Sequence, residues 1–220
     1  MSASSEAGAA VYSPLTLKLY DAWVLGISNR FAWHCPTRQV LQPFFDRHIG
    51  ANHLDVGVGT GYYLANAHLP DTTHVTLLDL NPSSLQAAKE RFGRADTQVL
   101  QHDVFKPLDA SQHGRYDSIS LFYLLHCLPG SMADKAEVFG SLKPCLKGNG
   151  VLFGATILGD AAEHNGFGRK LMDIYNKKGI FGNRGDTVQG LRSALEQHFA
   201  QVSIEVVGKV ALFSGRSPIL

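Results

Sequence analysis

Between residues 51 and 158 the chain alternates short apolar runs with amphipathic runs, and this alternation restricts the possible fold most strongly. The short apolar runs predict strands that are buried on both faces, and the amphipathic runs between them predict helices. Strands that alternate with helices form right-handed crossovers, so we expect a mostly parallel sheet with helices on both faces. The expected strands are 51–56, 73–80, 97–104, 116–125 and 150–158, and the expected helices are 61–69, 81–92 (N-cap Asn81, then Pro82) and 131–142 (N-cap Ser131).

The C-terminal part of the chain departs from this alternation. We expect a helix that Asp186 caps, with Leu191, Leu195 and Phe199 on one face. The segment QVSIEVV that follows alternates apolar and polar residues, and Gly208 and Lys209 separate it from the apolar segment VALFS. A Gly-X pair between two strands is typical of a two-residue hairpin turn. The prediction is therefore an α/β fold with a seven-stranded, mostly parallel sheet that ends in an antiparallel hairpin.

The N-terminal part of the chain predicts helices outside the sheet. Apolar residues recur with helical spacing at Leu15, Leu19, Trp23 and Ile27, so we expect Trp23 to lie in the core. A second helical stretch covers residues 37–48, and Pro43 inside it predicts a kink or two short helices. We divide the chain into an N-terminal helical lid, residues 1–50, and a core, residues 51–220.

A loop with three glycines at alternate positions follows the first expected strand, in the segment HLDVGVGTGYYL. Ligands of open α/β sheets bind beyond the carboxyl ends of the strands, so this loop predicts a ligand site. A dinucleotide fingerprint would need a third glycine where the chain has Tyr62, which disfavours an NAD-dependent oxidoreductase. The GxxxxGK[ST] phosphate loop is also absent, and the carboxylate of Asp55 would repel an anion and suits a cationic ligand.

The segment LDVGVGTG resembles the first motif of class I S-adenosylmethionine (SAM)-dependent methyltransferases, [DE]-x-G-x-G-x-G. The resemblance extends from about residue 50 to the C-terminus and implies a Rossmann-like fold with SAM as cofactor. It implies that Asp79 holds the ribose hydroxyls and that Asp103 lies near the adenine amine, with the backbone of Val104 as a donor. In total it places these residues around the cofactor: Asp55, Gly57, Gly59, Gly61, Asp79, Leu80, Asp103, Val104, Tyr123 and, from the lid, Tyr20.

Two of these carboxylates also have simpler interpretations when each is taken alone. Asp79 could cap the helix that follows it, and Asp103 could cap a turn before Pro107. The segment LKPCLKGNGVLFGATIL resembles the family's segment before the fifth strand, but Cys145 stands where the family has its first glycine. The ordered set of motifs, rather than any single one, favours the methyltransferase interpretation.

Two further segments bear on catalysis and on the substrate. His126 follows the fourth expected strand and is the candidate general base, with holding the loop or lining the cofactor pocket as its alternative role.

Residues 159–185 form an insertion that the resemblance implies to be a substrate cap, with Phe167, Leu171, Ile174 and Tyr175 on one helical face. It carries five basic residues that either recognise an acidic substrate or form a solvated face: Arg169, Lys170, Lys177, Lys178 and Arg184.

Composition narrows the choice of partners. The formal net charge of +1 gives no general attraction to nucleic acid or to acidic membranes, and no apolar run of about 18 residues is present. Three cysteines without CxxC spacing and ten histidines without HxxxH or HxH spacing predict no metal site. We expect a cytoplasmic methyltransferase that acts on a small molecule such as a secondary metabolite; the alternative is a SAM-binding module without methyl transfer. The acceptor, the attacking atom and the oligomeric state stay open.

Overall fold

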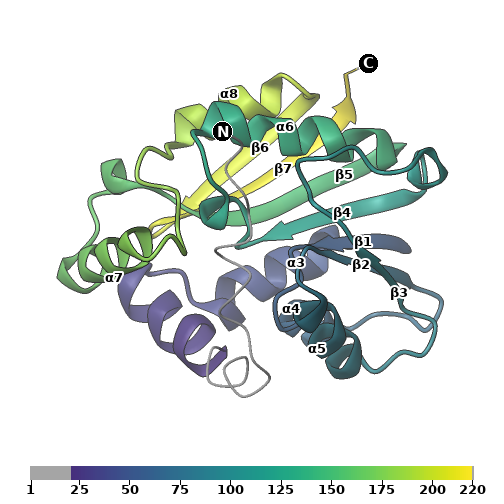
Figure 1. Cartoon of the computed structure of the whole chain (residues 1–220), viewed down its shortest axis with the longest axis horizontal. Coiled ribbons are helices and arrows are strands. Elements are labelled where there is room, and N and C mark those ends of the chain that lie inside the picture. The colour runs from purple at the N-terminus through teal and green to yellow at the C-terminus, as the bar shows by residue number, and fades with distance from the viewer. Residues whose placement is uncertain (1–20, 220) are drawn as a thin grey trace.

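In the computed structural model, which describes residues 21–219, seven strands form one sheet with the order β3-β2-β1-β4-β5-β7-β6 (Figure 1). The pairings among β1 to β5 are parallel, whereas β7 runs antiparallel to both β5 and β6. The predicted seven-stranded sheet with a terminal hairpin is therefore confirmed. The strands are β1 (Asn52–Val56), β2 (His74–Asp79), β3 (Gln98–Gln101), β4 (Tyr116–Phe122), β5 (Leu146–Ile157), β6 (Phe199–Val207) and β7 (Val210–Pro218).

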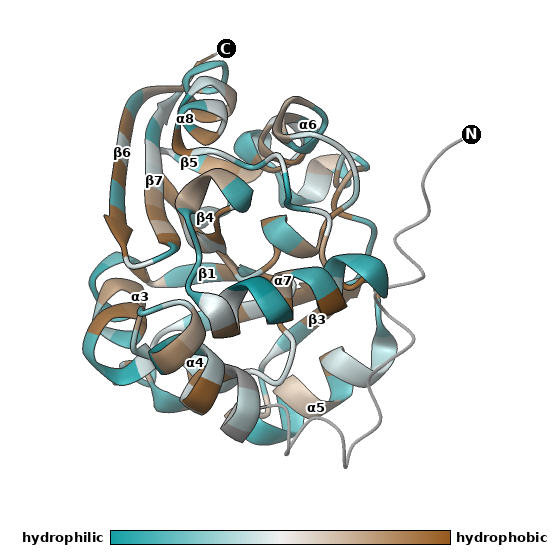
Figure 2. Ribbon diagram, turned by 90° about the vertical axis from the view of Figure 1, so that its left-hand side faces the viewer, coloured by the Kyte–Doolittle hydropathy of each residue, from teal (hydrophilic) through white to brown (hydrophobic). Residues whose placement is uncertain are grey.

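The hairpin forms where the sequence predicts it. Gly208 has φ of +60°, and Gly208 and Lys209 are the two residues between the last two strands. A positive φ is readily adopted only by glycine, and it lets the turn follow the twist of the two strands. Figure 2 shows hydrophilic and hydrophobic residues alternating along β6, as expected for an edge strand with one solvated face.

Helices cover both faces of the sheet, as predicted. One core cluster joins α6 and α8 to the sheet through residues such as Phe139 and Leu195, and the other joins α3, α4 and α5 to the opposite face through residues such as Phe45 and Ala88. Along β2, Leu77 belongs to the second cluster and Leu78 to the first, because successive strand side chains point to opposite faces. The α-helices are α3 (Gln42–His48), α4 (Tyr62–Asn66), α5 (Pro82–Phe92), α6 (Met132–Leu142), α7 (Gly166–Lys177) and α8 (Val188–Glu196). The other helical segments are η1 (Asp21–Ala32) and η2 (Thr37–Leu41), with π-type turns, and the short 3₁₀ segments η3 (Ala110–Gln112), η4 (Leu125–Cys127), η5 (Lys143–Cys145) and η6 (Asp160–Ala162).

Three of the predicted N-caps can be compared with the structure. Asn81 and Ser131 cap α5 and α6, and Ser131 forms a capping box with Asp134. The prediction that Asp186 caps the next helix is wrong, because the side chain of Thr187 accepts from the backbone N–H of Gly190 and α8 begins one residue later. The Asp186 carboxylate is instead buried, with Oδ2 2.7 Å from Nζ of Lys135. The carboxylate of Asp186, which the sequence pattern predicted to cap the helix, is therefore paired with the buried Lys135.

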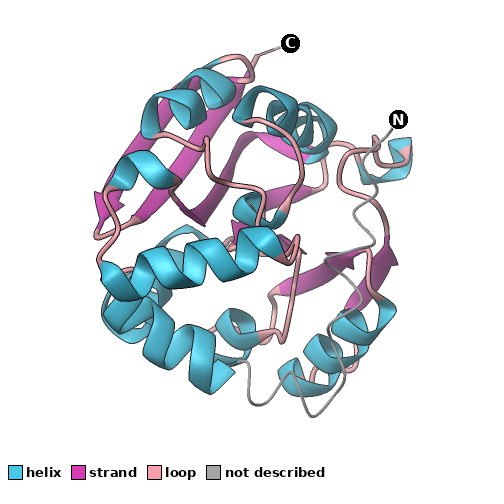
Figure 3. Ribbon diagram, turned by 60° about the vertical axis from the view of Figure 1, so that its left-hand side comes forward, coloured by secondary structure: helices cyan, strands magenta, loops and turns pink. Residues whose placement is uncertain are grey.

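In the N-terminal segment the structure agrees with one prediction and contradicts another. The split expected near Pro43 is present, because η2 ends at Leu41 and α3 begins at Gln42. Trp23, however, is 42% exposed and does not belong to the core, so its predicted burial is wrong. Its indole Nε1 donates to the hydroxyl of Tyr175 at 2.9 Å, and its ring meets Phe167 edge-on. The aromatic side chain thus joins η1 to α7, and Figure 3 shows these two helices beside each other.

Candidate functional site

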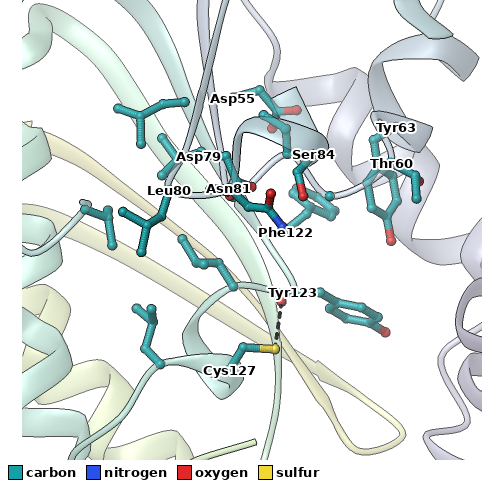
Figure 4. A pocket seen from close by; sticks show the side chains of 18 of the residues that line it. Asp55, Thr60, Tyr63, Asp79, Leu80, Asn81, Ser84, Phe122, Tyr123 and Cys127 are labelled. Atoms are coloured by element: carbon teal, nitrogen blue, oxygen red, sulfur yellow. Dashed lines mark hydrogen bonds between the residues drawn. The ribbon is translucent and has the colours of Figure 1, made fainter. Parts of the chain in front are cut away.

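A pocket opens at the carboxyl ends of β1, β2 and β4, where the strand order reverses between β1 and β4. This reversal is the general ligand site of open α/β sheets. Eight of the residues that the sequence assigns to the cofactor line this pocket: Asp55, Gly57, Gly59, Asp79, Leu80, Asp103, Val104 and Tyr123. Figure 4 shows side chains from several of these positions around one cavity. The sequence motifs therefore converge on a single site.

The three glycines of the loop have different surroundings, although all have positive φ, at +70°, +52° and +67°. A Cβ added to Gly59 would meet no protein atom within 4 Å, so the backbone there is open to a ligand in the pocket. A Cβ on Gly61 would lie 2.8 Å from Cα of Ala88 in α5. Gly61 does not line the pocket and instead permits close contact between the loop and α5. A Cβ on Gly57 would contact Leu124 at 2.8 Å.

Asp55 is buried at the end of β1 and faces the pocket. Burial raises the pKa of its carboxyl to about 6, a hydrogen bond from Ser120 Oγ to Oδ1 opposes this shift, and the charge of Asp79 adds to it. Because that pKa stays below 7, Asp55 is mostly ionised at neutral pH. An ionised carboxylate in a buried pocket favours a cationic group on the ligand.

Asp79 is the last residue of β2, Asp103 follows β3, and both line the pocket. Asp79 Oδ1 accepts from the backbone N–H of Asn81 at 2.9 Å, and Asp103 Oδ1 accepts from that of Phe105 at 3.1 Å. Burial raises the pKa of Asp79, and backbone donors of Asn81 and the glycine loop oppose the shift. Asp103 thus has the local turn role that its sequence position allowed, whereas Asp79 does not cap α5, because the N-cap of that helix is Asn81. Both carboxylates also line the pocket.

Many of the residues that line the pocket are apolar or aromatic. They include Leu25 of η1, Phe122 and Tyr123 at the end of β4, Leu124, and Ile180 after α7. Tyr123 has φ of +59°, an uncommon conformation for a residue with a side chain, and such strain is frequent at functional sites. No lysine or arginine is among the lining residues, so none of the five basic residues of the insertion lies on the described wall.

Several polar residues that line the pocket were not predicted from the sequence. These are Thr60, Asn81, Ser84, His102 and Cys127. Asn81 was predicted only as a helix cap, and Ser84 lies about one helical turn after it. Both line the pocket because α5 begins there, so the predicted start of this helix was the signal that could have identified them. Thr60 occupies a variable position between two motif glycines, and only the path of the loop places it on the wall.

His126 is buried and does not belong to the pocket wall. Its Nδ1 accepts from the backbone N–H of Ile157 at 3.3 Å, and its ring packs edge-on against Phe181 with 4.6 Å between centroids. Burial, followed by the charge of Lys135, lowers the pKa of the imidazole to about 3. Its backbone carbonyl accepts from the N–H of Gly182 at 2.8 Å. This setting favours the second role that the sequence allowed, holding the loop.

Tyr20 lies outside the described residues, so its predicted cofactor contact stays a prediction. Within residues 21–219, the side chains form no group of three or more that could hold a metal ion. In the same part of the chain, every helix is too short or too polar to cross a membrane.

The fold is that of a Rossmann-like domain with a ligand pocket at the point where the strand order reverses. Residues 54–152 match a family model described as a methyltransferase domain. The chain is 46% identical over 98% of its length to a physcion biosynthesis cluster O-methyltransferase of Aspergillus chevalieri, and covers 97% of that protein. It is 50% identical over 86% of its length to a putative uncharacterized protein, YbcY, of Escherichia coli K12, covering 97% of it.

A solved structure of the DhpI–SAH complex, where SAH is S-adenosylhomocysteine, has a similar fold with a TM-score of 0.70. The match covers 97% of this chain and 96% of that chain at 16% identity. The chain belongs to the class I SAM-dependent methyltransferases. It transfers a methyl group from SAM to a small-molecule acceptor.

Proposed function

We propose that this enzyme methylates a hydroxyl group of an apolar, aromatic or enolic small molecule of secondary metabolism. The observation that carries the proposal is that Leu25, Phe122, Tyr123 and Ile180 line the same pocket as the candidate cofactor residues, without a lysine or arginine among the described lining residues. The similarity to an O-methyltransferase of a physcion biosynthesis cluster supports an oxygen acceptor in this chemical class.

The residues of the pocket match a nucleoside with a sulfonium group. We assign Asp79 to the ribose hydroxyls, Asp103 and Val104 to the adenine, and Asp55 with the open backbone at Gly59 to the methionine part. Three observations support this assignment: the three carboxylates line one pocket, Gly59 lines it as well, and a Cβ on Gly59 would meet no protein atom within 4 Å. When bound, SAM supplies a methyl group that is already activated by the positive sulfur.

The chain contributes alignment and exclusion of water rather than strong base catalysis. With a pKa near 3 and its Nδ1 already accepting a hydrogen bond, His126 has little tendency to take a proton at neutral pH. A phenol or enol loses its proton more readily than an aliphatic alcohol, so such an acceptor has less need of a general base. We therefore assign His126 as a positioning residue for the segment around Phe181.

We propose that η1 and the 159–185 insertion together form the cap over the acceptor. Trp23 bonds to Tyr175 of α7, and the side-chain amide of Asn165 donates to the carbonyl of Phe31 at 2.8 Å. Leu25 and Ile180 then come from the two parts of this cap to the pocket wall. Deleting residues 1–30 should weaken acceptor and cofactor binding while the core stays folded; unchanged affinities would refute the lid.

The experiment that tests the proposed reaction is a panel of acceptors, with SAH release as the readout. Phenols, enols, amines and thiols of similar size are compared at saturating SAM. Turnover restricted to phenols and enols supports the proposal, and turnover of amines or thiols alone would overturn the oxygen acceptor. SAM binding without SAH release from any acceptor would favour the non-catalytic module instead.

A matched pair of glycine variants tests the cofactor site. Gly59→Ala and Gly114→Ala each place a methyl group in open space at positive φ, +52° and +63°, but only Gly59 lies in the pocket. The two variants should lose similar stability, whereas only Gly59→Ala should lose SAM affinity, by tenfold or more in calorimetry. Equal SAM affinities would refute the assignment of the loop.

The cytoplasmic location stays a prediction that cell fractionation would test.

A further inference from the structure

A row of buried polar side chains crosses from β1 to β4 behind the cofactor pocket. His53 Nδ1 lies 2.7 Å from Ser118 Oγ, and His53 Nε2 lies 3.1 Å from Ser120 Oγ. Ser120 Oγ in turn lies 2.5 Å from Asp55 Oδ1. The His53 ring is fully buried against Phe45, at 5.6 Å between centroids. A polar row in this position requires explanation, because its neighbours in the core are aromatic and aliphatic.

The direction of every hydrogen bond in the row follows from two charge states. The ionised Asp55 carboxylate can only accept, so the hydroxyl of Ser120 donates to it. Burial lowers the pKa of His53 to about 3, so its ring is neutral and carries one proton. Ser120 has one hydroxyl hydrogen, so it must accept from His53 Nε2, which then carries that proton. His53 Nδ1 is consequently an acceptor, and the hydroxyl of Ser118 donates to it. Ser118 Oγ is thereby left to accept, and the backbone N–H of Gly50 donates to it at 2.7 Å.

Each donor and acceptor of the row is therefore satisfied in one consistent arrangement that ends on Asp55. We propose that His53, acting through Ser120, is a positioning residue that fixes the orientation and the negative charge of the Asp55 carboxylate in the cofactor pocket. This inference rests on the proposed contact between Asp55 and the methionine part of SAM. His53 itself does not line the pocket.

Two influences oppose the effect of the row on the ionisation of Asp55. Burial and the carboxylate of Asp79 both favour the neutral form of Asp55, whereas the Ser120 hydroxyl favours the ionised form. Removal of this donor should extend protonation of Asp55 to higher pH. The other titratable or charged groups around the site are His102 and Asp103 after β3, Tyr62 and Tyr63 of α4, Tyr123 and Cys127 after β4, and Arg91 of α5, which contacts Thr60.

The test measures the dissociation constant of SAH by calorimetry between pH 5 and 7.5 for the wild type and five variants. SAH affinity of the wild type should fall below about pH 6, where Asp55 takes up a proton. Ser120→Ala should move this fall upward by about one to two pH units, because one hydrogen bond to the charged form is lost. His53→Leu should shift it in the same direction, and His53→Gln should restore much of the wild-type profile, because an amide can both donate and accept.

Ser118→Ala removes an equally buried hydroxyl of β4 that contacts His53 but does not touch Asp55. Its pH profile should shift less than that of Ser120→Ala, because the Ser120 hydroxyl that donates to Asp55 stays in place. Thermal unfolding of each variant separates lost affinity from lost structure. Nitrogen NMR of the histidines, assigned by comparison with His53→Gln, should show the Nε2–H tautomer for His53 near pH 7.5.

The remaining variant, Asp55→Asn, separates the two possible failures. If Asp55→Asn binds SAH as well as the wild type does, the proposed contact of Asp55 is wrong. If Asp55→Asn weakens binding but Ser120→Ala and His53→Leu keep the wild-type pH profile, the contact stands and the positioning role of His53 is refuted. An Nδ1–H tautomer of His53 would also refute it.

Discussion

Asp55→Asn is expected to stabilise the fold at neutral pH while it weakens cofactor binding. The folded protein raises the pKa of this carboxyl from 3.8 to about 6, so ionisation of Asp55 is harder in the folded state than in the unfolded chain. The asparagine amide has nearly the same shape, and its oxygen can still accept from Ser120. The substitution therefore removes a buried charge while it can keep the hydrogen bond of that charge.

The magnitude follows from the pKa shift. A shift of about two pH units, at about 1.4 kcal/mol for each unit, corresponds to at most about 3 kcal/mol at pH 7.5. A raised pKa means that Asp55 imposes no penalty below pH 3.8 and the full penalty above about pH 6. The stability difference between Asp55→Asn and the wild type should therefore be largest at pH 7.5 and vanish near pH 4.

Urea unfolding at pH 7.5, 6, 5 and 4 measures this difference, and SAH calorimetry on the same samples measures binding. Each kcal/mol should also appear as about 2–4 °C in the unfolding temperature of a chain of this size. An Asp55→Asn protein that is less stable than the wild type at pH 7.5, or a stability difference that does not change with pH, would refute the reasoning.

Three other residues give predictions from packing and from proton affinity. Lys135→Met should lower the free energy of unfolding by about 3–5 kcal/mol in urea titration, because it leaves the buried Asp186 carboxylate without its partner; a loss below about 1 kcal/mol would contradict this. Gly61→Ala should cost about 2 kcal/mol or more in the same assay, since its Cβ would lie 2.8 Å from Cα of Ala88, and an unchanged stability would show that α5 can move away. His126→Gln should keep kcat within about threefold at saturating acceptor, whereas a loss of 100-fold with unchanged SAM affinity would identify His126 as the general base after all.

The sheet could be predicted from sequence because its signals are local and mutually consistent. Asn81 followed by Pro82 marks the start of α5 by itself, and Gly208 marks the hairpin by itself. The predicted cap at Asp186 failed for a physical reason. A carboxylate just before a helix has the same local pattern whether it caps that helix or pairs with a lysine, and only the path of α6 brings Lys135 within 2.7 Å.

Trp23 shows the same limit for helix faces. Helical spacing of apolar residues identifies a face that contacts something, but it cannot distinguish the core from another surface helix. Trp23 contacts Tyr175, 152 residues away in the sequence, and stays 42% exposed. The five basic residues of the insertion were equally ambiguous, and Arg184 pairs with Asp160 and Asp173, at 3.3 and 2.7 Å.

The glycine motif marks the boundary between what sequence and structure can each assign. Gly59 and Gly61 have the same residue type, similar positive φ and adjacent places in one motif, and the sequence assigned both to the cofactor. Only the surroundings separate them: Gly59 lines the pocket and a methyl group there would meet no protein atom within 4 Å, whereas one at Gly61 would lie 2.8 Å from Cα of Ala88 in α5. The glycines of one motif can therefore serve two independent purposes, ligand access and helix packing. His53 lies on β1 two residues before Asp55 and outside the motif. Through Ser120 it nevertheless determines how the acidic residue of the motif, Asp55, is held.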